Sequence, residues 1–240
     1  MQIIKKIFKK LANKVGIQLS TYSIYSDDFL QLTKSLEYFD IDLVLDVGAN
    51  EGQFAKDLIN YGYKNKIISF EPIKEAHQKL LFKSKKYKQW IVHPRCAVGN
   101  QERQIKLNIS NNSVSSSLLD LKRNDHSQVE IEYLREENVI EKKLESLIFK
   151  YSKKYKNIFL KIDVQGYEDR VIEGCGTNIN LIKGIFLETS TEEIYFSQKL
   201  WDDIIIDLLK KDFKLWFISK GIIDLKTNRN LQNDFCLFKI

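Results

Sequence analysis

Acidic residues close several predicted buried strands, and their carboxylates are the groups in this sequence that point most directly to chemistry. Asp46 lies near the end of the apolar run at 43–47, and Glu71 follows a run that ends at Phe70. Asp163 and Glu188 end two later runs in the same way. A carboxylate at a strand end can bind sugar hydroxyls or accept a proton from a reacting group. These positions predict a ligand site built from strand ends.

The turn after Asp46 is unusually small. It reads GANEG over residues 48–52, and its two glycines let a backbone approach closely and adopt positive φ. It lacks the G-x-G-x-x-G of dinucleotide-binding folds and the G-K-[ST] of phosphate-binding loops. We therefore interpret the turn as a place where a ligand without a pyrophosphate lies against the backbone.

Glu71 gives the second indication. It lies 25 residues after Asp46, and Pro72 favours an extended conformation for it at the strand end. An acid at this point can accept both hydroxyls of a ribose. Ribose recognition without a pyrophosphate loop predicts a nucleoside cofactor, and S-adenosylmethionine fits. Asp46 and the turn would then hold its amino-acid end and the edge of its sugar.

The stretch LKIDVQGYE, residues 160–168, gives the third indication. Asp163 ends a strand there, and it would either accept a proton from an attacking hydroxyl or cap the helix that follows. Glu188, in IFLETS, would either contact the substrate or make a structural hydrogen bond. No histidine lies in this motif, and we expect no metal.

Composition sets the limits of the fold. The chain has 240 residues, of which 43% are hydrophobic and 29% charged, a balance typical of one globular domain. Three widely spaced cysteines favour a reducing compartment over a disulfide framework. No apolar run is long enough to cross a membrane, and we see no secretion signal. We expect a cytoplasmic protein.

The first 19 residues form a distinct basic unit. Apolar residues recur at helical spacing from Ile3 to Val15, and five lysines fill the other positions without any acid. Such a helix would either cap the domain or lie peripherally on an anionic membrane surface. We divide the chain into residues 1–40, with this amphipathic helix and a lead-in helix, and a catalytic domain over 41–240.

From residue 43 onward, strand-like and helix-like runs alternate, which predicts a mostly parallel α/β sheet with helices on both faces. Seven strands are expected, at 43–47, 66–70, 90–93, 157–162, 184–188, 214–219 and 234–239. Helices are expected at 28–39, 53–61, 74–83, 167–173 and 200–212. A turn-rich link without a helix joins the last two strands, so the last strand should be antiparallel. Extended runs within 104–147 predict a strand pair inserted between the third and fourth core strands.

Taken together, DVGANEGQF at 46–54, FEP at 70–72, SSSL at 115–118 and LKIDVQGYE resemble the FkbM family of S-adenosylmethionine-dependent methyltransferases. The resemblance runs from about residue 43 to the C-terminus. It implies a class I, Rossmann-like methyltransferase fold and methyl transfer to an oxygen, often on a sugar or a secondary metabolite.

The resemblance also implies roles for individual residues. The cofactor would be bound by Asp46, Gly48, Ala49, Asn50, Gly52, Phe54, Glu71, Pro72 and Ala97, with Glu71 on the ribose and Ala97 beside the adenine. Ser116, Ser117, Gln165 and Glu168 would face the acceptor. Asp163 would belong to the active-site motif together with Gln165 and Glu168. From the chemistry of hydroxyl methylation we expect Asp163, with Glu188, to carry the catalysis, and His93 and His126 are alternative bases.

Two other functions stay open. A nicotinamide-dependent oxidoreductase would use the same sheet and ribose acid, but the third glycine of its fingerprint is absent. A non-catalytic nucleoside-binding module would keep the fold but lose the site. The acids at Asp46, Glu71 and Asp163 argue against it. We expect a small-molecule or glycan acceptor, and no nucleic acid, because no basic stripe interleaved with aromatics crosses the motifs. The inserted segment and the loop TSTEEIYFSQ would select the acceptor. In that loop, Tyr195 and Phe196 would either stack on a sugar or pack the next helix.

Overall fold

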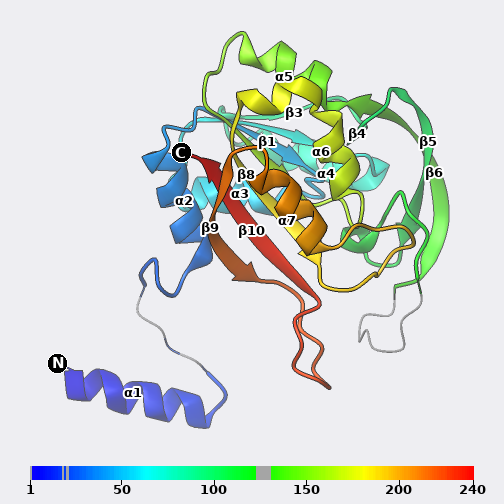
Figure 1. Ribbon diagram of the computed structural model, residues 1–240. Helices are drawn as coiled ribbons and strands as arrows, with labels where there is room; N and C mark the ends of the chain where they lie inside the picture. The colour runs from blue at the N-terminus through cyan, green and yellow to red at the C-terminus, as the bar shows by residue number, and fades with distance from the viewer. Residues whose placement is uncertain (1, 18, 20–21, 123–130) are drawn as a thin grey trace.

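The computed structural model describes residues 2–17, 19, 22–122 and 131–240. Its centre is a sheet in the order β3-β2-β1-β7-β8-β10-β9 (Figure 1). The strands are β1 (Leu43–Val47), β2 (Lys66–Phe70), β3 (Trp90–Val92), β7 (Ile158–Ile162), β8 (Ile182–Ser190), β9 (Phe213–Lys220) and β10 (Gln232–Lys239). Only β10 runs antiparallel to its neighbours in this sheet. The predicted class I methyltransferase fold, with its antiparallel last strand, is confirmed.

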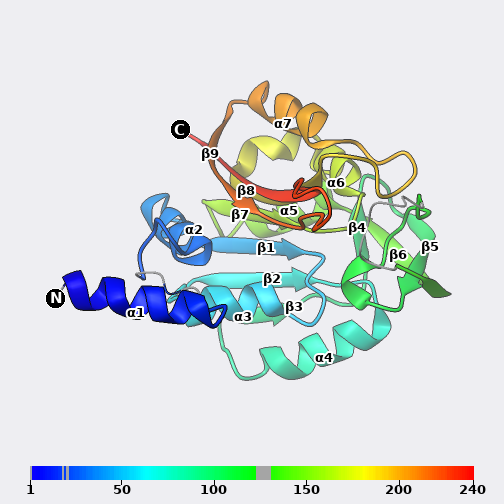
Figure 2. The ribbon, with the colours of Figure 1, turned by 90° about the horizontal axis from the view of Figure 1, so that it is seen from below.

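Helices cover both faces of the sheet, as Figure 2 shows. On one face lie α5 (Leu144–Ser152), α6 (Glu168–Gly174) and α7 (Trp201–Leu209), and on the other α2 (Asp28–Tyr38), α3 (Gln53–Asn60) and α4 (Lys74–Ser84). Each group buries its apolar stripe in a separate core cluster against the sheet. The lead-in helix α2 buries Leu32 and Leu36 in the same cluster as α3, so it packs as part of the sheet's cover.

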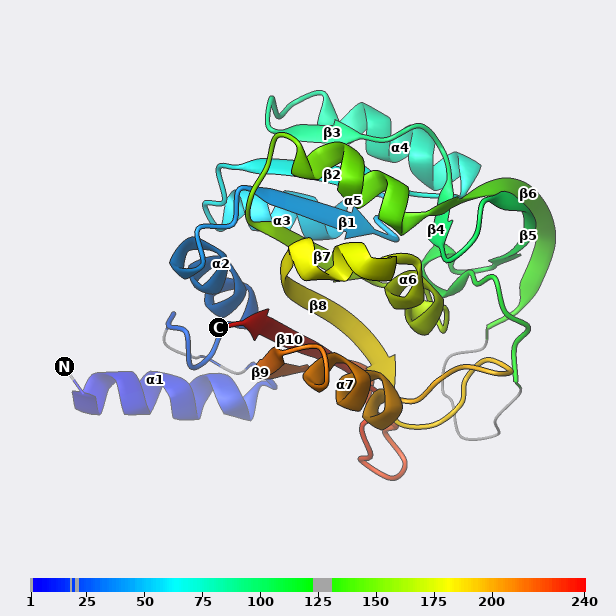
Figure 3. The same cartoon turned by 45° about the horizontal axis from the view of Figure 1, so that its top comes forward.

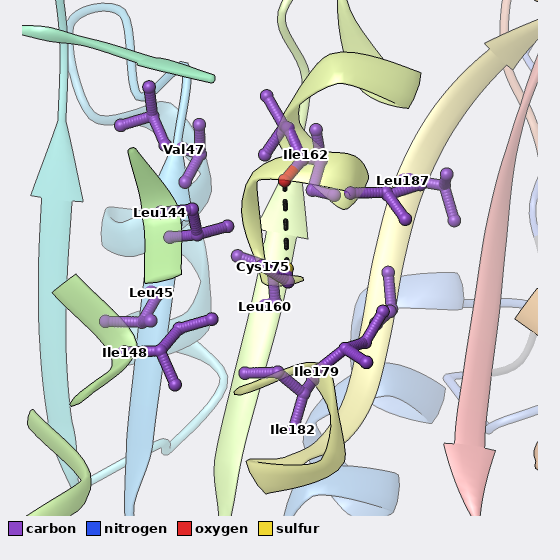
Figure 4. Packing of buried hydrophobic residues seen from close by; sticks show 14 of the residues in the cluster. Leu45, Val47, Leu144, Ile148, Leu160, Ile162, Cys175, Ile179, Ile182 and Leu187 are labelled. Atoms are coloured by element: carbon purple, nitrogen blue, oxygen red, sulfur yellow. Dashed lines mark hydrogen bonds between the residues drawn. The ribbon is translucent and has the colours of Figure 1, made fainter. Parts of the chain in front are cut away.

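Strand alternation decides which side chains reach which layer. Leu45 and Val47 on β1, and Leu160 and Ile162 on β7, point to the α5–α6–α7 side (Figure 4). The residues that alternate with them along each strand point to the α2–α3–α4 side, where Val44 and Phe159 enter the second core.

The same two-residue period carries polar groups onto that second side, near the carboxyl ends of β1, β7 and β8 and near the amino end of the antiparallel β10. These groups are Asp46, Lys161, Glu188 and Asp234, one each from β1, β7, β8 and β10. Four ionisable side chains are thus brought together on one face of the sheet, at the end where the parallel strands finish.

The inserted segment forms a second sheet of three strands, in the order β4-β6-β5. Strands β5 (Arg103–Ser110) and β6 (Tyr133–Lys143) are antiparallel, and β4 (Ala97–Gly99) pairs in parallel with β6. Neither β4 nor α5 was expected. Helix α5 is short, and its buried Leu144, Leu147 and Ile148 follow the helical period only where β6 ends.

Helix α1 (Gln2–Lys14) lies apart from the layered domain (Figure 1). Its described apolar side chains include Phe8 and Leu11, which are 62% and 56% exposed. This is not the packing expected of a helix that caps the domain. In the described part of the chain, no helix is both long and apolar enough to span a bilayer.

Gly48 is required by the packing of the two central strands. Its φ is +75°, and a Cβ there would lie 1.8 Å from the Asp163 carbonyl oxygen on the neighbouring chain segment. Gly62 provides a matched control, because its φ is +100° but nothing lies within 4 Å of a Cβ. Gly62→Ala should cost only the conformational penalty of about 1–2 kcal/mol. Gly48→Ala should cost about 2–5 kcal/mol, because the overlap adds to that penalty.

The free energy of unfolding of both variants, measured by chemical denaturation, checks this prediction. Equal losses of unfolding free energy in the two variants would show that the close approach of the Asp163 carbonyl oxygen is not the reason for a glycine at position 48.

Candidate active site

Two adjoining hollows open at the carboxyl edge of the sheet. Gly48, Asn50, Val114 and Asp163 line both of them. The first hollow is otherwise lined mainly by Val47, Phe70, Glu71, Pro72, Ile73, Cys96, Ala97, Val98, Leu107, Ser113, Ser116, Leu118, Val164 and Gln165. The second hollow is otherwise lined by Phe29, Ala49, Gln53, Phe54, Asp57, Lys161, Ile162, Phe186, Glu188 and Asp234.

Glu71 is the only carboxylate of the first hollow besides Asp163 among the described residues. Its Oε2 accepts the N–H of Asn50 at 2.7 Å, and its Oε1 accepts the N–H of Ile73 at 2.7 Å. Burial raises the pKa of Glu71 to about 7, against the lowering effect of these two hydrogen bonds. Each oxygen keeps a further lone pair, so the carboxylate can also accept ribose hydroxyls.

The turn between β1 and α3 is held in an unusual conformation. Gly48 and Ala49 donate their N–H groups to the Phe70 carbonyl oxygen, which ties the turn to the end of β2. Asn50 has a φ of 47°, in the left-handed region that non-glycine residues rarely adopt. Its side-chain amide reaches across to the Ser113 hydroxyl at 3.1 Å. The turn therefore connects the carboxyl ends of β1 and β2 to the inserted segment.

Two residues predicted to contact the cofactor lie behind the turn instead. Asp46 is completely buried, lines neither hollow, and accepts the Ser69 hydroxyl at 2.7 Å. Gly52 is also absent from both hollows, and a Cβ there would collide with the Trp90 ring at 2.4 Å. Asp46 therefore supports the turn, and Gly52 makes room for core packing against α4 and β3.

Lys161 lies under the turn, and sequence reasoning did not single it out. It is 5% exposed, with its Nζ 3.3 Å from Asp46 Oδ1 and 3.5 Å from Asp163 Oδ2. It also donates to the carbonyl oxygen of Gly48 at 2.9 Å. Its signal in the sequence was a lysine inside an otherwise apolar strand, which has to find an acid when buried.

Gln165 bridges Asp163 and Glu188 by hydrogen bonds. The Gln165 amide nitrogen donates to Asp163 Oδ1 at 2.9 Å and to Glu188 Oε2 at 2.8 Å. Its amide oxygen accepts the Tyr195 hydroxyl at 3.1 Å. Gln165 has a φ of 54°, so this bridge is made from a strained backbone position.

Asp234 completes the acidic side of the second hollow. It lies directly opposite Glu188 in the antiparallel pairing of β10 with β8. Burial, then the charge of Asp163, raises the pKa of Asp234 to about 7. Burial, then Asp163 and Asp234, raises the pKa of Glu188 well above its usual value. The signal for Asp234 was again an acid in an apolar strand, the feature that marked Asp46.

The predicted acceptor-binding residues divide into two groups. Ser116 and Gln165 line the first hollow. Ser117 is 1% exposed and donates to the Gln165 carbonyl oxygen at 2.6 Å, so it holds the motif instead of facing the cleft. Glu168 is also buried away from both hollows and accepts the N–H groups of Val164 and Gly166.

The remaining aromatic and histidine candidates do not enter the site. Tyr195 is fully buried and packs against Gly166, whereas Phe196 is exposed. His93 lines neither hollow, and one of its ring nitrogens bonds the Pro94 carbonyl oxygen at 2.9 Å. His126 lies outside the described residues.

The residues present fit a nucleoside with a cationic tail. The first hollow combines one buried carboxylate for ribose hydroxyls with an apolar lining, including Phe70, Ala97 and Leu118, for a purine. The second hollow carries more carboxylates than cations, which suits the sulfonium and ammonium groups of S-adenosylmethionine. Of the other residues predicted to bind the cofactor, Ala49 and Phe54 line this second hollow, and Pro72 and Ala97 line the first.

The fold and the site define a class I methyltransferase. A family model described as the methyltransferase FkbM domain matches residues 46–215. The chain therefore belongs to the FkbM methyltransferase family. No curated protein matched the chain by sequence.

Solved structures give further likenesses. The methyltransferase FkbM from Methylobacillus flagellatus KT has a TM-score of 0.51 and 14% identity, covering 82% of this chain and 44% of that one. This likeness shows the fold, and the chain spans less than half of that protein. A putative RNA methyltransferase from Pyrococcus horikoshii has a TM-score of 0.46 and 12% identity, covering 89% and 82%. A putative S-adenosylmethionine-dependent methyltransferase from Listeria monocytogenes has a TM-score of 0.46 and 11% identity, covering 88% and 98%.

The raised pKa of Glu71 predicts a pH-dependent affinity for S-adenosylhomocysteine. Ribose hydroxyls donate to the ionised carboxylate, so affinity should fall as pH falls through about 7. Glu71→Gln should bind more weakly above pH 7, where the wild-type carboxylate is ionised, and should show a flatter dependence. Calorimetric titration between pH 6 and 8.5 measures both. A wild-type affinity that does not change over this range would contradict the assignment of Glu71 to the ribose.

Proposed function

We propose that this protein transfers a methyl group from S-adenosylmethionine to a hydroxyl oxygen of a sugar, a glycan or a secondary metabolite. The observation that carries the proposal is the meeting of Asp163, Glu188 and Asp234 in the second hollow, which shares Gly48 and Asn50 with the first. An acceptor hydroxyl in this hollow would have carboxylates beside it to take its proton. S-adenosylmethionine bound across the two hollows would supply a methyl group already activated for displacement, with S-adenosylhomocysteine as the leaving group.

The protein's own contribution is alignment and proton transfer. A sugar hydroxyl is a poor nucleophile at neutral pH, and positioning it beside a base lowers the barrier. Asp163 is placed for this role because it lines both hollows. Gln165 fixes one of its oxygens, and Lys161 lies beside the other. The carboxylate is thus held in one orientation between the two ligand positions.

Glu188 and Asp234 form the second part of the proposed proton path. Facing carboxylates in a buried place disfavour double ionisation, so one of them retains its proton more strongly than an exposed acid. A base with a pKa near neutrality accepts a proton more effectively than an ordinary carboxylate. We infer that Glu188 assists Asp163, with which it shares the amide of Gln165.

The alternative functions are less well supported. An oxidoreductase would need the pyrophosphate cradle that the turn at 48–52 lacks, and membership of the FkbM methyltransferase family weighs against it. A non-catalytic module would not need three carboxylates brought together next to the cofactor hollow.

Asp163→Asn should separate catalysis from cofactor binding. The amide keeps the shape of the side chain but cannot accept the hydroxyl proton, so kcat should fall about 10²–10⁴-fold. The affinity for S-adenosylhomocysteine should fall much less than kcat, because Glu71 still accepts the ribose hydroxyls and Asp57, Glu188 and Asp234 still line the hollow assigned to the ammonium group. Methyl transfer from labelled cofactor to a panel of hydroxylated sugars and metabolites measures the first quantity, and calorimetry the second. Full turnover by the variant would remove Asp163 as the base.

The pH–rate profile should depend on Asp234. If ionised Glu188 is needed, the rate falls as pH drops through its raised pKa, which Asp234 helps to raise. Asp234→Asn removes that repulsion, so the acid limb of kcat should move to lower pH. Asp57→Asn is the matched control, because Asp57 lines the same hollow but is not among the main causes of that pKa shift. An acid limb that stays in place in Asp234→Asn would exclude this pairing.

A further inference from the structure

Exposed lysines gather at the edge of the sheet opposite the two hollows. Because β1, β2, β3, β7, β8 and β9 run in the same direction, the turns that lead into them share one edge. We call the exposed lysines of these turns, with Lys214 at the start of β9, the lysine edge: Lys64, Lys85, Lys86, Lys88, Lys153, Lys154, Lys156, Lys210, Lys211 and Lys214.

Few acids offset this charge. Asp40 and Asp42 precede β1, and Asp212 precedes β9, but the turns before β2, β3 and β7 carry none. Asp42 is already used, because it accepts the N–H groups of Lys156 and Asn157. Within the described chain, Lys210 is the only member of the lysine edge with an ion pair, to Asp207 at 3.9 Å. The lysine edge therefore presents free positive charge.

The lysine edge is broad. It follows the sheet from β3 to β9, and with neighbouring strands about 4.8 Å apart it extends over roughly 30 Å. Figures 2 and 3 show β1 and β2 pointing away from the end of the domain at which α1 lies. The basic helix and the lysine edge are therefore found toward the same end.

Helix α1 adds an apolar component to this charge. Lys6, Lys9 and Lys10 are exposed, and so are Phe8 and Leu11. A helix that leaves basic and apolar side chains free is typical of segments that lie in the headgroup region of a bilayer. Polybasic surfaces are attracted to anionic lipid within about a Debye length, roughly 10 Å at 0.1 M salt.

We propose that the lysine edge and α1 together dock the protein on an anionic lipid bilayer. Lysines suit lipid phosphates as mobile point charges, and exposed Phe8 and Leu11 gain from acyl chains but not from a nucleic-acid backbone. Docking in this way turns the two hollows away from the bilayer. Given the proposed function, on which this consequence rests, the acceptor would then be met in the aqueous phase.

The test is binding of the full chain to vesicles of phosphatidylcholine alone and of phosphatidylcholine with phosphatidylglycerol in a two-to-one ratio. The wild type should bind only the anionic vesicles, and added salt should weaken the binding. The triple variant Lys85→Glu, Lys86→Glu, Lys88→Glu should bind roughly tenfold more weakly or worse. Phe8→Ser with Leu11→Ser should also weaken binding, at low salt as well as high.

The matched control reverses three exposed lysines away from the lysine edge: Lys106→Glu, Lys220→Glu and Lys226→Glu. It changes the net charge by the same amount and should retain most of the binding. An equal loss in both triple variants would reduce the effect to net charge and overturn the proposal.

Absence of wild-type binding to anionic vesicles would also overturn it, including the case in which single-stranded RNA is bound instead. Unfolding midpoints confirm that the variants are folded. Titration with S-adenosylhomocysteine, in the absence of vesicles, keeps a failure of docking distinct from a failure of the proposed methyl transfer.

Discussion

The arrangement of the site depends on one ammonium group buried between β1 and β7. Burial alone would lower the pKa of Lys161, but Asp46 and Asp163 outweigh that effect and hold the pKa above its usual value. An unpaired charge at this depth would be costly, so the three side chains have to stay together. Because Lys161 also bonds the Gly48 carbonyl oxygen, the pairing fixes the start of the turn and one oxygen of Asp163 at once.

Close contact between the two strand ends imposes a second constraint. Gly48 leaves space for the Asp163 carbonyl oxygen, and the residues beyond each end adopt left-handed conformations, Asn50 after β1 and Gln165 after β7. Both side chains are then used as bridges, Asn50 to the inserted segment and Gln165 to Glu188. Both bridging residues therefore have unfavourable backbone conformations. The rest of the fold holds them there, and their hydrogen bonds fix the arrangement of the cleft.

The sequence predicted the sheet well because strand runs, turns and helix periods are local signals. It also predicted that Glu71, Asp163 and Glu188 lie at one edge, since parallel strands bring their ends together. It could not separate residues that face the hollow from those just behind it. Asp46, Gly52, Ser117 and Glu168 belong to the same motifs as the lining residues, but their orientation depends on the turn geometry. Asp234 was missed because its partner Glu188 is 46 residues away in the sequence, and only the antiparallel pairing brings them together.

The distribution of charge says more than the net charge of +6. Lysines collect where strands begin, while Asp163, Glu188 and Asp234 collect where they end or, for β10, start, with Lys161 already neutralised by its own pairing. An anionic acceptor would meet repulsion at the second hollow, and its own charge would further raise the pKa values of Glu188 and Asp234. A neutral hydroxylated acceptor avoids both effects. The same molecule can therefore attract anions at one edge and disfavour them at the other, because strand direction sorts the two kinds of charged residue.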